Sequence, residues 1–173
     1  MQSRAFWKAV TVDESDLLAR LLALLREERI RFCVIGGQGV NAYAEPVVSL
    51  DLDVVIAAGD VDRLTALLRQ QFRLERFEHS LNLSDPASDL RVQIQLDPRY
   101  EPFVAGAAVQ DVLGERLPVA RIEDVLQGKI WAALDASRRA SKRQKDLADI
   151  SRLLEASPSL RARVPQEILD RLL

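Results

Sequence analysis

Two aspartates, Asp51 and Asp53, are the residues whose type and spacing suggest chemistry most directly. They lie in the segment 50–56, which is rich in β-branched residues and is therefore predicted to be a strand. Side chains at positions i and i+2 of a strand point to the same face, so the two carboxylates converge. Neighbouring carboxylates repel each other unless a cation lies between them, and oxygen ligands suit Mg²⁺ or Mn²⁺. The pair predicts either a divalent-metal site or a solvated strand end.

A pair of glycines, Gly36 and Gly37, lies just before these aspartates in the sequence. It follows the apolar run Phe32–Ile35, predicted as a buried strand, and precedes a short predicted helix over residues 38–44. Glycine lets the backbone approach a ligand closely, and N–H groups at a helix start favour an anion such as phosphate. A Gly-Gly pair can equally be a turn and nothing more.

Together the two features resemble the signature of the DNA polymerase β-like nucleotidyltransferase superfamily: a strand, Gly-Gly, a short helix, then a strand with Asp-x-Asp. The matching stretches are VIGGQGVNAY from Val34 and SLDLDVV from Ser49. Further along, QGKIWA from Gln127 and KRQKDLADI from Lys142 resemble bacterial AbiEii-type nucleotidyltransferases, several of which belong to toxin–antitoxin systems. The resemblance covers residues 30–154 or so.

This resemblance implies an α+β (α/β) nucleotidyltransferase fold, with a small mixed β-sheet flanked by helices and a helical C-terminal portion. It implies transfer of a nucleoside monophosphate from an NTP such as ATP to RNA, protein or a small molecule. Asp51 and Asp53 would bind one or two Mg²⁺ or Mn²⁺ ions, and a cognate toxin–antitoxin partner is a further expectation. The nucleotide-binding residues that it implies are Gly36, Gly37, Gln38, Ser49, Lys129 and Lys145.

A third carboxylate, which active members usually carry on a neighbouring strand, is missing from the expected position. The matching strand, 90–96, alternates polar and apolar residues and places Gln93 there. Glutamine offers a carbonyl oxygen but no charge, so we expect Asp51, Asp53 and Gln93 to form the catalytic set. Asp97 would be a substitute only if the strand continued that far, and Pro98 argues that it ends. The alternative is a catalytically impaired protein that binds an NTP or a toxin–antitoxin partner.

Lys129 and Lys145 also have a simpler interpretation. Lys145 belongs to a basic run over residues 138–145, and most such runs are solvated helix faces. Asp146 and Asp149 lie within one helical turn of several of these basic residues and could pair with them. The sequence leaves open whether the two lysines bind phosphate.

The remaining pattern mixes helices and strands, with helices alone in the C-terminal third, and predicts an α/β or α+β core. Predicted helices cover 13–28, with Asp13 as N-cap, 60–70, 122–134, 141–154 and one or two segments of 158–173 that restart at Pro165. Predicted strands cover 72–77 and 89–96, on either side of the turn-prone residues 82–88, and a hairpin covers 109–119. We expect a single domain over residues 1–173, with a core over about 30–120 and a helical part over about 121–173.

Composition narrows the class of protein further. The 173 residues include 24 Lys plus Arg and 26 Asp plus Glu, for a net charge of −2, which excludes a broadly basic nucleic-acid coat but not a local basic patch. The lone Cys33 is expected to be a buried thiol, and the lone His79 excludes a multi-histidine zinc site. No signal peptide and no membrane span is apparent, so we expect a cytoplasmic protein without membrane contact.

Overall fold

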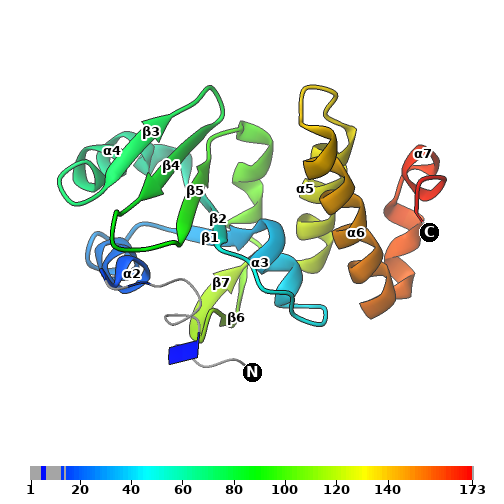
Figure 1. Ribbon diagram of the computed structural model, residues 1–173, viewed down its shortest axis with the longest axis horizontal. Coiled ribbons are helices and arrows are strands. Elements are labelled where there is room, and N and C mark those ends of the chain that lie inside the picture. The colour runs from blue at the N-terminus through cyan, green and yellow to red at the C-terminus, as the bar shows by residue number, and fades with distance from the viewer. Residues whose placement is uncertain (1–4, 7–12, 14, 173) are drawn as a thin grey trace.

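A seven-stranded mixed β-sheet forms the centre of the computed structural model, which describes residues 5–6, 13 and 15–172 (Figure 1). The strands are β1 Phe32–Ile35, β2 Asp51–Ile56, β3 Arg73–Arg76, β4 Ser80–Ser84, β5 Arg91–Gln95, β6 Ala108–Val112 and β7 Glu115–Val119. Their order is β3-β4-β5-β2-β1-β7-β6, with β1 parallel to β7, β2 parallel to β5, and the other neighbours antiparallel. The mixed sheet with flanking helices that the sequence predicts is confirmed.

Strand β4 is the one strand that the sequence analysis missed. The prediction of a turn over 82–88 was wrong at its start, because Asn82 lies inside β4. Asn and Ser are poor strand formers, but Leu81 and Leu83 alternate with them and are each only 1% exposed. Burial of these two leucines on one face outweighs the local preference for a turn, and the SLNLS alternation was the available signal.

The helices are α2 Leu17–Glu27, α3 Gly36–Asn41, α4 Val61–Leu68, α5 Ile122–Leu134, α6 Ala140–Ala156 and α7 Gln166–Leu169. Three 3₁₀ segments cover Ala58–Asp60, Pro98–Phe103 and Pro158–Arg163. The helix expected from residue 13 begins at Leu17, because Asp16 has a left-handed backbone with φ of 52°. Asp13 still caps it from outside, since its Oδ1 accepts a hydrogen bond from the Leu17 N–H at 2.9 Å. The final segment restarts after Pro165 as predicted, and Leu173 lies outside the described residues.

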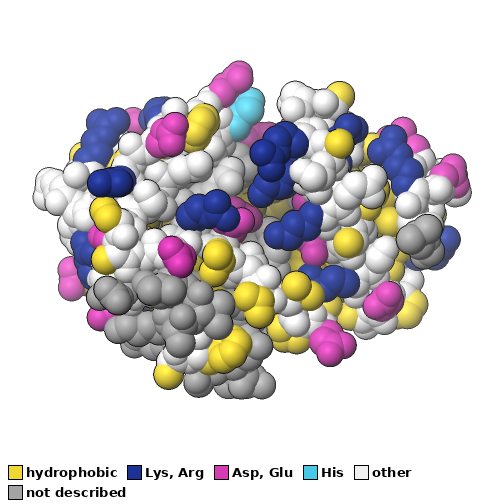
Figure 2. Space-filling view, in the orientation of Figure 1, with side chains coloured by type: hydrophobic (Ala, Val, Ile, Leu, Met, Phe, Trp, Pro, Cys, Tyr) yellow, Lys and Arg dark blue, Asp and Glu magenta, His cyan; other side chains and the backbone are white. Residues whose placement is uncertain are grey.

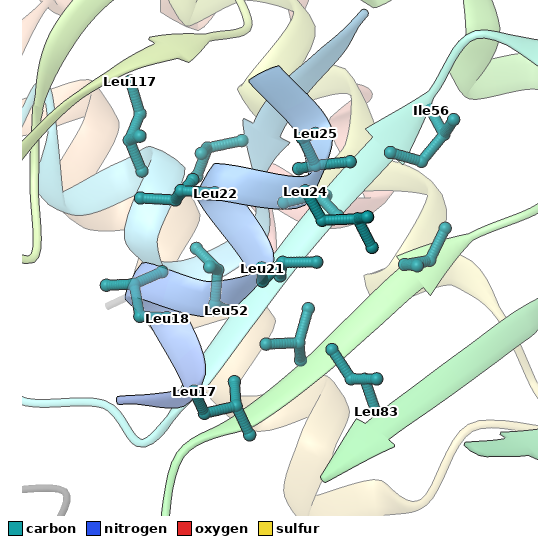
Figure 3. Close-up of a cluster of buried hydrophobic side chains, with 14 of the residues drawn as sticks. Leu17, Leu18, Leu21, Leu22, Leu24, Leu25, Leu52, Ile56, Leu83 and Leu117 are labelled. Carbon is teal, nitrogen blue, oxygen red and sulfur yellow. The ribbon is translucent and has the colours of Figure 1, made fainter. Parts of the chain in front are cut away.

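The two faces of the sheet are covered differently. On one face, the leucines of α2 pack against alternate residues of the strands, among them Leu52 and Ile56 of β2 and Leu83 of β4 (Figure 3). On the other face, Val55 packs with residues of α5 and α6, such as Ile130 and Ile150. Among the described residues, this second cluster takes strand residues only from β1 and β2, so it leaves that face of β3, β4 and β5 free of buried apolar residues.

Cys33 belongs to this second cluster and is fully buried, as the sequence predicts. Burial raises the pKa of its thiol to about 12, and the nearby Asp124 carboxylate adds to the effect. A thiol with such a pKa is not reactive at neutral pH, so Cys33 has a packing role. Among the described residues no helix is both long and apolar enough to cross a membrane.

Candidate active site

The pairing of β2 with β5 aligns the residues that the sequence analysis singled out. Asp51 lies opposite Arg91 and Asp53 lies opposite Gln93 in the parallel register. Asn82 of β4 lies opposite Gln93, and Glu75 of β3 lies opposite Asn82. Since paired residues share a face, a row of polar side chains runs across four strands on the face that the helices leave open.

A pocket of about 380 Å³ opens over this row, between the sheet and the helices α5 and α6. The space-filling view shows Lys and Arg side chains gathered around a hollow in the middle of the molecule, with acidic side chains among them (Figure 2). The lining consists of Gly37, Ser49, Asp51, Asp53, Glu75, Asn82, Leu83, Ser84, Arg91, Val92, Gln93, Lys129, Arg138, Lys142, Lys145 and Asp146. A smaller pocket of about 90 Å³ shares Asp53, Gln93 and Lys129 with it and reaches Gly36 and Tyr100. Most of the predicted site residues therefore surround one hollow.

The two glycines have different surroundings. Gly36 has a φ of 66°, and a Cβ atom placed on it would collide with the carboxylate of Asp53. A Cβ atom on Gly37 would meet nothing within 4 Å, and Gly37 lines the larger pocket. Gly36 thus lets α3 begin directly against Asp53, while the backbone of Gly37 is the part that a ligand can approach.

Gln38, predicted as a phosphate ligand, does not line either pocket and is only 2% exposed. Its Nε2 donates to the carbonyl of Ser49 at 3.2 Å, and its Oε1 accepts from Asn41 at 3.2 Å. The Ser49 hydroxyl in turn accepts a hydrogen bond from the Asp51 N–H at 3.2 Å. Gln38 and Ser49 therefore hold the entry of β2 against α3, and of these two only Ser49 reaches the pocket.

The charge around the aspartates is only partly balanced by the chain itself. Arg91 forms a salt bridge with Asp51, with 2.9 Å between Nε and Oδ1. Burial raises the pKa of the Asp53 carboxyl, the Asp51 charge raises it further, and Lys129 is the strongest of the positive groups that lower it. A divalent cation would relieve this repulsion, and two carboxylates with the Gln93 carbonyl oxygen are hard donors that suit Mg²⁺ or Mn²⁺. Among the described residues no group of three or more His, Cys, Asp or Glu side chains is placed to hold a metal. The carboxylates beside Gln93 are those of Asp51 and Asp53.

Lys129 is bound by two aspartates of α6. Its Nζ lies 3.1 Å from Asp146 Oδ1 and 2.8 Å from Asp149 Oδ2, and all three residues are buried. Burial by itself would lower the pKa of Lys129, but Asp149 and Asp146 raise it above the ordinary lysine value, so the ammonium stays charged. Arg138 also pairs with Asp146, at 2.7 Å. Of the basic run over residues 138–145, the partner of Asp146 is thus Arg138, which is eight residues away rather than within one helical turn, and Lys129 comes from the preceding helix. Lys129 and Lys145 both line the pocket.

Asp97 does not reach either pocket. Strand β5 ends at Gln95, as Pro98 suggested, and Asp97 caps the 3₁₀ segment that follows by accepting a hydrogen bond from the Arg99 N–H at 3.0 Å. The Arg99 side chain also pairs with this carboxylate and lowers its pKa. The structure therefore leaves Gln93 as the side chain beside Asp53.

Besides the apolar Leu83 and Val92, seven pocket residues were not among the predicted site residues: Glu75, Asn82, Ser84, Arg91, Arg138, Lys142 and Asp146. Glu75 and Asn82 were missed because β4 was not predicted, so nothing indicated that β3 and β4 extend the polar row. The sequence pattern predicts Arg91 only as a polar position of its strand, and Arg138 only as a member of the basic run over residues 138–145. The alternation of 80–84 is the signal that would have found the first two.

Several solved structures have the same fold as this chain, and two of those described below are named as an adenylyltransferase and a nucleotidyltransferase-like protein. The antibiotic-resistance factor ANT(2'')-Ia has a TM-score of 0.56 at 14% identity, with 85% of this chain and 90% of that chain covered. The lincosamide antibiotic adenylyltransferase LnuA, bound to lincomycin, has a TM-score of 0.54 at 14% identity, with 83% and 99% covered. An antigenic nucleotidyltransferase-like protein from Paracoccidioides brasiliensis has a TM-score of 0.52 at 17% identity, with 86% and 75% covered.

Family membership follows from the sequence itself. The model of the family described as "Nucleotidyl transferase AbiEii toxin, Type IV TA system" matches residues 16–172. The chain belongs to the AbiEii nucleotidyltransferase family. No curated protein sequence matches it.

Proposed function

We propose that this protein is a metal-dependent nucleotidyltransferase that moves a nucleoside monophosphate from an NTP to an acceptor hydroxyl. The observation that carries the proposal is that Asp51 and Asp53 of β2 and Lys142 and Lys145 of α6 line one pocket of about 380 Å³. A pocket that is lined by both carboxylates and ammonium groups suits a triphosphate together with a divalent cation.

In this proposal each part of the pocket has a separate task. Asp51 and Asp53, with the Gln93 carbonyl, hold Mg²⁺ or Mn²⁺, which when bound supplies positive charge to the triphosphate. The backbone of Gly37 and the ammonium groups of Lys142 and Lys145 bind the phosphates. Lys129 stays paired with Asp146 and Asp149 and contributes positive charge beside Asp53 without leaving its partners.

The reaction is an in-line displacement at the α-phosphorus. The acceptor oxygen forms a bond to this phosphorus, the bond to the bridging oxygen of the β-phosphate breaks, and pyrophosphate leaves with the electron pair. The acceptor hydroxyl loses its proton to water, because the side chain beside Asp53 is the amide of Gln93, which does not take up a proton as a carboxylate would. RNA, protein and small molecules all offer suitable hydroxyl groups.

The test is incubation of the purified chain with each labelled NTP, Mg²⁺ or Mn²⁺, and total cellular RNA. We expect label transfer in the wild type and a loss of at least about 1,000-fold in Asp51→Asn and in Asp53→Asn, since charge neutralisation at a transferring phosphoryl group is worth several kcal/mol. Asp111→Asn is the matched control, because Asp111 is a strand aspartate in a salt bridge outside both pockets. Equal activity in all three variants would refute the site.

A second candidate is a nucleotide-binding protein whose catalysis is impaired. The observation that favours it is Gln93, an amide directly opposite Asp53 where a carboxylate would add charge for a metal and a proton acceptor. It predicts NTP binding without turnover in the wild type and a gain of turnover in Gln93→Asp. Turnover in the wild type would exclude this candidate.

We further propose a role in a toxin–antitoxin pair, as the description of the family indicates. Isolation of the chain from its native host together with a second protein that suppresses its transfer activity would support this role. A chain that is recovered alone and is fully active in the host would count against it.

A further inference from the structure

The strand that borders the two aspartates brings a cation and an amide to the site. Arg91 and Gln93 are two residues apart on β5, so both side chains lie on the face of Asp51 and Asp53. Arg91 is opposite Asp51 in the register, and its Nε lies 2.9 Å from Asp51 Oδ1. All four residues line the same pocket.

The two aspartates therefore differ in how many carboxylate oxygens remain available to bind a metal. One oxygen of Asp51 already forms a salt bridge with a guanidinium, whereas Asp53 has no salt bridge among the described residues. Two carboxylates carry two negative charges, which one divalent cation neutralises. The other carboxylates that line the pocket are Glu75, which lies three strands from Asp53 in the register, and Asp146, which is paired with Lys129 and Arg138. A second divalent cation beside the two aspartates would therefore have no carboxylate of its own and would be repelled by the positive charge of Arg91.

A guanidinium is suited to part of the work of a second cation. It is planar, remains charged at any physiological pH, and donates up to five N–H bonds in a geometry that matches phosphate oxygens. With Nε on Asp51, the terminal nitrogens of Arg91 remain for another acceptor in the pocket. The Arg91 side chain is 66% exposed, so it can reorient toward a bound triphosphate without rearrangement of the core.

We propose that this site uses a single divalent cation, bound by Asp51 and Asp53, and that the Arg91 guanidinium replaces a second cation at the transferred phosphoryl group. This inference rests on the proposed function. Arg91 donates to a non-bridging oxygen of the α-phosphate while the acceptor oxygen bonds to phosphorus and pyrophosphate leaves. Arg91 would then neutralise part of the negative charge that builds on the equatorial oxygens, and a cation held by Asp51 and Asp53 would supply further positive charge.

The chain offers a closely matched control for Arg91. Arg116 of β7 pairs with Asp111 of β6 across adjacent strands, with 3.4 Å between the charged atoms. Its side chain is 67% exposed, nearly the same as that of Arg91, but it lines neither pocket. Arg116→Gln removes an equivalent exposed strand arginine without touching the site.

The first measurement counts Mn²⁺ ions bound per chain by electron paramagnetic resonance, with α,β-methylene analogues of the NTPs present in turn. We expect one Mn²⁺ in the wild type and in Arg91→Gln. The double variant Arg91→Gln/Gln93→Asp should bind two, because it replaces the guanidinium and adds a carboxylate. Two ions in the wild type would overturn the single-metal inference and leave the proposed function intact, whereas no ion in the wild type would overturn the metal site and with it the proposed function.

The second measurement separates a phosphate-binding role of Arg91 from a structural one. In Arg91→Gln we expect the rate of nucleoside monophosphate transfer to fall about 100-fold, as it does when an enzyme loses one hydrogen-bond donor to the transition state. One Mn²⁺ should still be bound to this variant. Without nucleotide, its affinity for Mn²⁺ should rise about two- to fivefold, since an exposed ion pair with Asp51 no longer competes. Transfer and Mn²⁺ affinity equal to those of Arg116→Gln would refute the role of Arg91.

Discussion

Two clusters of charged side chains adjoin each other in this protein, and they balance their charges in different ways. The helical cluster consists of Lys129, Arg138, Asp146, Asp149 and Arg152 of α5, α6 and the loop between them, and each aspartate pairs with two cations. The strand pair consists of Asp51 and Asp53, with Arg91 as the one salt-bridge partner among the described residues. Both carboxylates of the helical cluster are neutralised by cations of the same chain, whereas the strand pair has an excess of negative charge that a ligand can neutralise.

The comparison shows how the same residue types serve two purposes at one site. Buried ion pairs are costly to form, but they fix side chains in a defined geometry when every member has a partner. The helical cluster thereby holds Lys129 near Asp53. The charge of Lys129 lowers the pKa of Asp53, whereas burial raises it. One cluster positions charge, and the other is available to bind a cation.

Removal of one member of the helical cluster should produce the largest loss of stability. In Asp146→Asn, the buried Lys129 loses one of its two partners and Arg138 loses its salt bridge. We expect the free energy of unfolding to fall by about 3 kcal/mol, the low end for breaking a buried ion pair because Arg138 is partly exposed. Urea denaturation of wild type and variant measures this difference.

Asp111→Asn provides the comparison, since Asp111 pairs with Arg116 at the surface. Loss of an exposed pair should cost no more than about 1 kcal/mol. If both variants lost the same stability, the helical cluster would have no special role in holding Lys129.

A side chain at Gly36 should disturb the strand pair, because Gly36 lies directly against Asp53. Gly36→Ala requires a left-handed backbone for alanine and pushes a methyl group into the Asp53 carboxylate. We expect a loss of about 1–3 kcal/mol in stability, together with weaker Mn²⁺ binding. Gly37→Ala is the control, because its Cβ would have open space, and its stability should change little or increase. Chemical denaturation and Mn²⁺ titration of both variants check the prediction, and a stable Gly36→Ala chain with normal Mn²⁺ binding would contradict it.

The charge of Asp53 itself gives the smallest effect, and its sign depends on pH. Because the pKa of Asp53 is raised in the folded chain, the folded state binds its proton more tightly than the unfolded state does, and stability falls as pH rises toward the folded pKa. Asp53→Asn avoids this loss, so without metal it should melt at a higher temperature than the wild type at about pH 8 and at the same temperature below about pH 4. Thermal melts in a chelator at several pH values measure the difference.

Asp97→Asn should behave in the opposite way. Arg99 lowers the pKa of Asp97, so its charge stabilises the fold above the ordinary aspartate pKa and the contribution disappears as pH falls through the lowered value. The variant should therefore melt below the wild type at about pH 8. A destabilised Asp53→Asn chain at that pH would show that Asp53 is already neutralised by its own chain.

Local patterns in the sequence were sufficient for much of the fold and for the centre of the site. The strands around Gly36 and Asp53, the hairpin of β6 and β7, and the helix Ile122–Leu134 all form where their periodicity predicts them. The common face of Asp51 and Asp53 also follows from strand periodicity alone, because it depends only on residues two positions apart. Strand β4 was missed because its polar residues favour turns, and only its burial against α2 makes it a strand.

What the sequence by itself determined is which residues can carry charge and which of them share a strand or a helix. Only the tertiary structure decided which charges meet: Arg91 beside Asp51, Gln93 beside Asp53, and Lys129 between Asp146 and Asp149. It also turned Gln38 toward Ser49 and away from the pocket. The physical reason is that strand register and helix packing join residues far apart in the chain, and these long-range contacts are selected by burial of the whole core rather than by local preference.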